Sequence, residues 1–125
     1  MTRELATDLR GVVAKRVADS VQLYADFTDY LAVSGATIST VTVSCSDDAT
    51  LTLGTPSVLT GSTNVPAEDE QGNVVSRTIA ANKGCKVLVG AGTAQDDDDD
   101  PIRLKWRVVL STGEIIERCG RIRVE

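Results

Sequence analysis

Acidic side chains are the residues of this 125-residue chain whose number and spacing suggest chemistry. The longest acidic run consists of Asp96, Asp97, Asp98, Asp99 and Asp100. A second cluster, in the polar stretch 60–73, consists of Glu68, Asp69 and Glu70. Grouped carboxylates can bind a divalent cation, take part in acid–base catalysis or attract a basic partner. Since charge runs are also commonly solvated loops, three interpretations of the acid stay open: a solvated loop, a docking surface and a cation site.

Other catalytic arrangements find little support in the sequence. The chain has no histidine, which excludes Ser-His-Asp and Cys-His nucleophiles and every histidine-ligated metal. It contains no G-x-S-x-G, P-loop or dinucleotide-binding pattern, and the aspartate run lacks the glycine and the spacing of an EF-hand loop. We therefore expect no enzyme activity, no catalytic residue, no metal ligand set and no cofactor.

The three cysteines, Cys45, Cys85 and Cys119, are too widely spaced for a typical zinc site. An odd number cannot pair completely within one chain. All three lie in apolar stretches, so we expect small buried hydrophobic side chains, with a disulfide as the alternative.

Charge and hydropathy limit the partners. The formal net charge is −5, which leaves no basic excess for a nucleic-acid groove. No apolar run approaches the about 18 residues of a membrane span, and the first residues lack the apolar segment of a secretory signal. We expect no nucleic-acid or membrane partner, and synthesis in the cytoplasm.

Alternating apolar and polar residues predict β-strands along most of the chain. The expected strands are 20–27, 38–45, 50–58, 74–81, 85–89, 102–111 and 114–124, with Pro56 interrupting the third or placing it at an edge. The clearest signal is the hairpin 102–124, with Trp106 facing inward and a β-bulge expected at Gly120. About seven short strands predict an all-β domain over 20–125, an antiparallel two-sheet sandwich of Ig-like architecture.

Strands that alternate in direction would place the loops 28–37, 59–73 and 90–101 at one end. Asp29 and both acidic clusters would then form one acidic pole, whereas the middle of each sheet would be balanced in charge. The exposed row Arg103, Lys105 and Arg107 is expected to draw the aspartate run back onto its own strand.

The segment 1–19 carries a helical spacing of apolar residues and several cations. Two interpretations have equal weight: a short helix, or an arm that becomes ordered on a partner. The candidate interface therefore combines this segment with the acidic loops. Its N-terminal members are Leu5, Leu9, Arg10, Val12, Val13, Lys15 and Arg16, the apolar ones as anchors and the cations as contacts for an acidic loop of a neighbour.

Several motifs resemble the small Ig-like fibre proteins of tailed bacteriophages, often called fibre–tail adaptors. The similarity covers about residues 20–124 and is carried by YADFTDYL at 24–31, SGATI at 34–38, GAGT at 90–93, STGE at 111–114 and ERCGRIRV at 117–124. The aspartate run with Pro101, the stretch 60–73 and the N-terminal segment depart from the family pattern.

The resemblance implies a virion structural protein, repeated around the particle, that joins tail fibres to the tail or portal region. Its partners would be other virion proteins and further copies of itself. The first alternative is a capsid decoration protein on the major capsid protein of the head. The second is a non-viral ligand-binding β-sandwich, for which Tyr30 is the clear loop aromatic.

Overall fold

The computed structural model describes residues 2–32, 34–68, 71 and 73–125. These residues are mostly β-strand with one short helix, which confirms the all-β prediction. The elements in chain order are β1 (Thr2–Thr7), β2 (Val12–Lys15), β3 (Ser20–Asp26), α1 (Thr28–Leu31), β4 (Ile38–Ser44), β5 (Leu51–Leu53), β6 (Ser57–Val58), β7 (Thr63–Glu68), β8 (Val74–Ile79), β9 (Gly84–Ala91), β10 (Ile102–Leu110) and β11 (Ile115–Val124).

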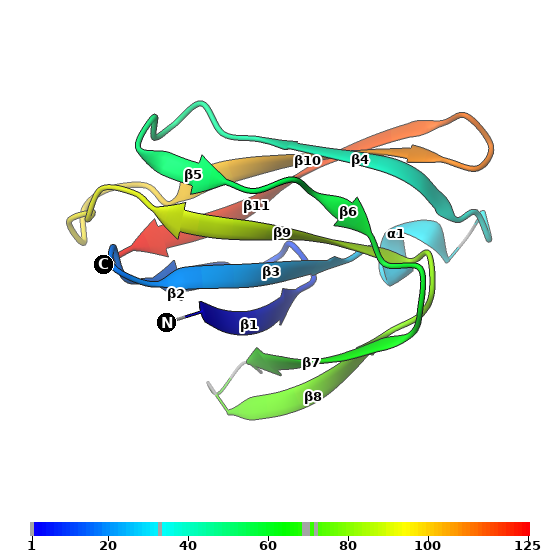
Figure 1. Cartoon of the computed structure of the whole chain (residues 1–125), viewed down its shortest axis with the longest axis horizontal. Helices are drawn as coiled ribbons and strands as arrows, with labels where there is room; N and C mark the ends of the chain where they lie inside the picture. Colours follow the sequence, from blue (N-terminus) through cyan, green and yellow to red (C-terminus); the bar gives the residue numbers. More distant parts are fainter. Residues whose placement is uncertain (1, 33, 69–70, 72) are drawn as a thin grey trace.

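Two larger sheets enclose the main core (Figure 1). One sheet has the order β1-β3-β9-β5, with β6 also paired to β9, and the other has the order β2-β11-β10-β4. The described residues thus form eleven strands rather than about seven, partly because the expected strand 50–58 is divided between β5 and β6 around Pro56. The sheets are mixed rather than antiparallel, since β1 pairs in parallel with β3 and β2 in parallel with β11.

The N-terminal segment corrects the prediction of a helix or a detachable arm. β1 extends one sheet and β2 extends the other, so this segment connects both layers. Leu5 lies in β1, Leu9 in the connection and Val13 in β2, and all three are buried in the main core. The spacing of four between Leu5, Leu9 and Val13 fits one face of a helix, but it also fits two strands joined by a turn. The segment forms strands because its backbone pairs with β3 and β11, and such tertiary contacts override helix propensity.

A third, two-stranded sheet of β7 and β8 lies beside β1 (Figure 1), and its buried residues pack with Ala6 of β1 and with β3. Tyr24 of β3 points to this side, opposite Leu23, and packs in a second core with Val65 and Ile79. The polar stretch 60–73, expected to be a loop, contains β7. Arg77 of β8 also holds this sheet, because its Nε lies 2.7 Å from Oδ2 of the buried Asp26.

The β10–β11 hairpin is present as predicted, but its parity differs from the expected one. The pairing runs without a bulge from Ile102–Ile122 to Val109–Ile115. Ile122, Val124 and Gly120 are buried on one face, whereas Cys119 and Glu117 are exposed on the other. Gly120 packs closely against the core, since a Cβ there would lie 3.3 Å from the Trp106 indole nitrogen and 3.1 Å from Leu9.

Candidate interaction surface

The outward face of the four-stranded sheet carries a concentration of cations. Strand pairing places Arg103 opposite Arg121, Lys105 opposite Cys119 and Arg107 opposite Glu117. We call this surface the basic face, and its cations are Arg103, Lys105, Arg107, Arg121 and Arg123. The expectation that the middle of each sheet is balanced is wrong for this sheet, because Glu117 is the single acid on these two strands' outward faces.

Acidic side chains neutralise part of the basic face. The Lys105 ammonium lies 2.9 Å from a Glu117 carboxylate oxygen, and this hydrogen bond, with help from the charge of Arg107, holds the Glu117 pKa below its ordinary value. Asp47, between β4 and β5, accepts hydrogen bonds from the Arg103 guanidinium at 3.2 and 3.3 Å and from its backbone N–H at 3.0 Å. The same bonds lower the pKa of Asp47.

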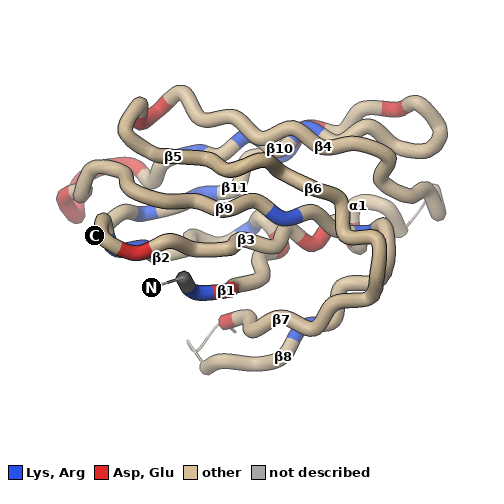
Figure 2. The backbone as a smooth tube through the Cα atoms, viewed as in Figure 1, with Lys and Arg blue, Asp and Glu red and all other residues tan. Residues whose placement is uncertain are grey.

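The aspartate run forms a turn at one end of this face, between β9 and β10 (Figure 2). We call Asp96–Asp100 the acidic turn. Arg123 holds it through the backbone, donating to the carbonyls of Asp96 at 3.0 Å and Asp99 at 2.7 Å. Gln95 adds a bond to the Asp100 carbonyl at 2.8 Å. The Asp99 carboxylate accepts a hydrogen bond from the Asp96 backbone N–H at 2.9 Å, and all five aspartates of the turn are exposed.

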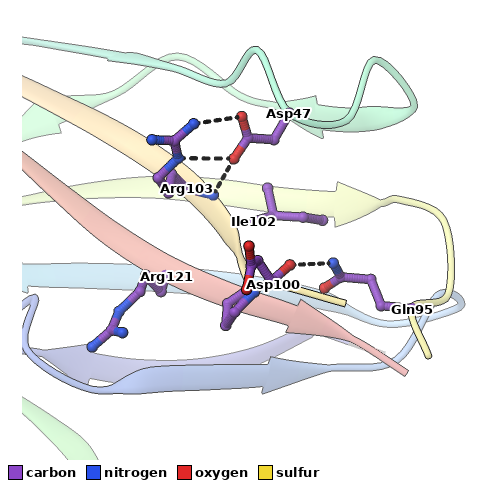
Figure 3. Close-up of a pocket in the computed structure, with 7 residues that line it drawn as sticks. Asp47, Gln95, Asp100, Ile102, Arg103 and Arg121 are labelled. Atoms are coloured by element: carbon purple, nitrogen blue, oxygen red, sulfur yellow. Dashed lines mark hydrogen bonds and ion pairs between the residues drawn. The ribbon is translucent and has the colours of Figure 1, made fainter. Parts of the chain in front are cut away.

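An open groove of about 610 Å³ separates the acidic turn from the basic face (Figure 3). Asp47, Arg103 and Ile102 line one part, and Gln95, Asp100, Pro101 and Arg121 line the rest. In Figure 3 the Asp47–Arg103 and Gln95–Asp100 pairs face each other from different strands and loops. Both charge signs therefore meet in one exposed groove, which suits a polar surface contact better than an apolar ligand.

The expected capture of the acidic turn by Arg103, Lys105 and Arg107 does not occur. Arg103 binds Asp47, and Lys105 binds Glu117. The cation that holds the turn is Arg123, and its bonds go to carbonyl oxygens rather than to carboxylates. A guanidinium beside a tight turn can satisfy carbonyls that the turn leaves without partners.

The predicted acidic pole is not present as one group. β3 and β9 are antiparallel, with Asp26 opposite Gly84, so Asp29 after β3 lies at the opposite end of the sheet from the loop that follows β9. The exposed Glu68 ends β7 in the third sheet. Asp69 and Glu70, also named as interface candidates, lie outside the described residues.

The N-terminal interface candidates are divided by burial. Leu5, Leu9 and Val13 belong to the core and cannot anchor the chain to another protein, so that part of the prediction is wrong. Val12 and Arg16 are exposed. Arg10 is exposed but lies 3.2 Å from the carboxylate of Asp29 in its own chain.

Lys15 has an internal role instead of the expected contact with a neighbour. It is 2% exposed, and its ammonium donates to the carbonyls of Arg16 at 2.6 Å, Val17 at 3.4 Å and Ala91. Burial lowers its pKa, and the charge of Asp19 partly opposes this shift. Lys15 thereby ties the end of β2 to the end of β9.

Replacing Lys15 with methionine is expected to lower the free energy of unfolding by about 1–3 kcal/mol, because the carbonyls of Arg16, Val17 and Ala91 lose the charged donor that they share. Urea unfolding at pH 7 followed by circular dichroism measures the change. The matched control is Arg16→Met, whose exposed side chain should alter stability by no more than about 0.5 kcal/mol. Equal stability of the two variants would contradict the internal role of Lys15.

The cysteines are all free, and they occupy three environments: Cys85 is buried, Cys45 is half-buried and Cys119 is exposed. The expectation of burial is therefore confirmed for Cys85 and wrong for Cys119. Burial raises the pKa of the Cys85 thiol to about 12. Cys119 is exposed because the register of β11 turns it outward beside Lys105.

Sequence reasoning missed Asp47, Arg121 and Arg123 as parts of this surface. The signal was present, since arginines recur at alternate positions in both strands of the predicted hairpin. The assumed bulge at Gly120 gave the wrong face only to Ile115, Glu117 and Cys119. It left Arg121 and Arg123 on the outward face, and what the sequence did not show was their place opposite β10.

Within the described residues no group of three or more cysteine, aspartate or glutamate side chains is placed to hold a metal ion. None of the described helices is long and apolar enough to cross a membrane. No protein-family model, curated protein or solved structure matches this chain.

Proposed function

We propose that this chain is a structural component of a bacteriophage particle, an adaptor that joins tail fibres to the tail or portal region through an Ig-like β-sandwich. The observation that carries the proposal is the charged surface itself: a basic sheet face, an acidic turn clamped by Arg123 and a shared exposed groove. Such a surface suits binding to other proteins, since polar and charged contacts define orientation and partner choice.

The motifs that resemble fibre–tail adaptors also support this proposal. The aromatic-rich segment 24–31 ends β3 and forms α1, and the segment 111–124 forms the turn and second strand of the hairpin. These segments supply residues of the main core, including Phe27, Leu31 and Ile122. The similarity therefore involves residues that build the domain.

Tyr30 gives less support to a ligand-binding module. Its ring is covered by the guanidinium of Arg118, 4.9 Å from the ring centroid. Its hydroxyl donates to the Asp8 carbonyl at 3.3 Å, and Phe27 contacts the same ring. The loop aromatic that a flat ligand would need is thus already in use within the chain.

The test is to locate the chain in purified particles. Mass spectrometry of gradient-purified particles should find it in a fixed ratio to the tail and portal proteins, and antibody labelling should mark the neck or the tail. Label spread over the head would overturn the adaptor role in favour of capsid decoration. Absence of the chain from intact particles would overturn both virion roles.

A further inference from the structure

We propose that copies of this chain associate head to tail, with the acidic turn of one copy bound to the basic face of the next. The inference rests on the proposed function, in which the chain is repeated around a particle. The occupant of the basic face is a second copy, because the same molecule carries the acidic turn and the basic face on different parts of its surface.

Part of the basic face remains available to a partner. Arg103 is engaged by Asp47, and Arg123 is engaged by the carbonyls of its own acidic turn. Lys105 and Arg107 share the single carboxylate of Glu117, which lies opposite Arg107 but forms its ion pair with Lys105. Positive charge is therefore in excess at the middle of the face.

Polar side chains continue this surface beyond the cations. β4 pairs with β10 on the other side, where Ser44 lies opposite Lys105 and Thr42 opposite Arg107. Both hydroxyl side chains are exposed. Hydroxyl donors beside ammonium and guanidinium groups suit a carboxylate ligand, because each carboxylate accepts several hydrogen bonds.

The acidic turn cannot cover this region within its own chain. Arg123 and Gln95 bind its backbone at the end of the four-stranded sheet where β10 begins. Arg107 lies four positions beyond Arg103 on β10, about 13 Å farther along the strand. Docking to Lys105 and Arg107 therefore requires the turn of another molecule.

A second copy fits the face better than a long polyanion. The chain as a whole carries a net charge of −5, so a long polyanion with a charge at every phosphate is repelled outside the small basic patch far more than a second copy is. A neighbouring copy instead presents a compact turn whose backbone is already fixed, so little ordering is needed on binding. The donor and acceptor surfaces differ, which makes the contact heterologous and suited to a ring or filament. One such contact per copy is weak, but a repeated array multiplies it.

Sedimentation velocity of the full chain over a range of concentrations, in 50 and 500 mM NaCl, tests the proposal. The wild type should form multi-copy species at low salt, with association at least about tenfold weaker at high salt. The double variants Lys105→Glu/Arg107→Glu and Asp97→Lys/Asp98→Lys should each stay monomeric. Mixing the two should restore association in hetero-pairs, because the intact acidic turn of the first variant meets the intact basic face of the second, and the two reversed surfaces are complementary as well.

Control variants separate this contact from general charge effects. Lys86→Glu lies on β9 in the other large sheet, and Glu114→Lys lies in the turn at the far end of β10. Both should associate like the wild type, and circular dichroism should show that every variant is folded. A monomeric wild type at low salt, or association that the charge-reversal variants leave unchanged, would overturn the proposal.

Two further results separate the second-copy contact from a polyanion site and from the virion role. Binding of a fluorescent single-stranded oligonucleotide by the monomeric wild type, lost in Lys105→Glu/Arg107→Glu, would assign the face to a polyanion and overturn the second-copy contact. Presence of the chain in particles is measured separately, so a monomeric chain found in particles would leave the proposed virion function in place and remove only this contact.

Discussion

Replacing Trp106 with alanine is expected to lower the free energy of unfolding by about 3–5 kcal/mol, the usual cost of deleting a large buried aromatic side chain. Trp106 is completely buried and is the largest such side chain among the described residues. It lies on β10 against Gly120 of β11, at the centre of the sheet that carries the basic face. Urea unfolding followed by far-UV circular dichroism measures the loss, since the variant has no tryptophan for fluorescence.

A phenylalanine at this position gives a graded comparison. The indole N–H of Trp106 has no hydrogen-bond partner in the described part of the chain. Trp106→Phe therefore removes volume without leaving a former partner unpaired, and we expect a loss of about 1–2 kcal/mol. An alanine variant as stable as the phenylalanine variant would show that Trp106 does not fill the core as described.

Replacing Asp26 with alanine is expected to cost about 3–5 kcal/mol, because it breaks a largely buried ion pair and removes hydrogen-bond acceptors. The Asp26 carboxylate is 5% exposed. It accepts from the Thr28 backbone at 2.9 Å, the Thr28 hydroxyl at 2.5 Å and Arg77 Nε at 2.7 Å. One residue thus connects β3, the start of α1 and the third sheet.

The contribution of Asp26 should depend on pH. Burial alone would raise the pKa of this carboxyl, but the hydrogen bonds from Thr28 and Arg77 outweigh burial and hold it below the ordinary value of 3.8. A lowered folded-state pKa stabilises the folded protein at pH values above that ordinary value, and the stability is lost as pH falls through the folded-state pKa.

The matched variant for this pH effect is Asp26→Asn, which keeps the shape and removes the charge. Its deficit relative to the wild type should be large at pH 7 and should shrink below about pH 4, when the wild-type carboxyl becomes protonated. Urea unfolding at several pH values from 7 to 3 measures this. A deficit that stays constant across the series would mean that the ionised carboxylate does not provide the stabilisation.

Local alternation predicted the class and most strands, because a strand buried on one face must alternate. The expected ranges 20–27, 38–45, 74–81, 85–89, 102–111 and 114–124 correspond closely to β3, β4, β8, β9, β10 and β11. β1 and β2 escaped prediction because each pairs in parallel with a strand that does not follow it directly, β1 with β3 and β2 with the distant β11, and alternation does not specify such partners. β7 escaped because its buried face has only two apolar residues, Val65 and Ala67, and the proline between them argues against a strand.

The candidate surface was predictable only in part. The acidic turn was visible as a run of five aspartates, and the cations of β10 were visible as an outward row. The hydrogen-bond partners of these groups could not be predicted, because they depend on the pairing register of the strands and on loops that are distant in sequence. Asp47 reaches Arg103 across 56 positions of the chain, and Arg123 reaches the acidic turn from the last strand.

The parallel pairing of β2 with β11 also has a consequence for how the protein forms during synthesis. Val12 pairs with Arg121, so the four-stranded sheet stays incomplete until β11 has left the ribosome. Contacts so distant in sequence slow folding, because the intervening chain must be ordered before they can form. The buried Val13 of β2 is therefore synthesised well before the strand that pairs with it, which makes the nascent chain a candidate for chaperone binding.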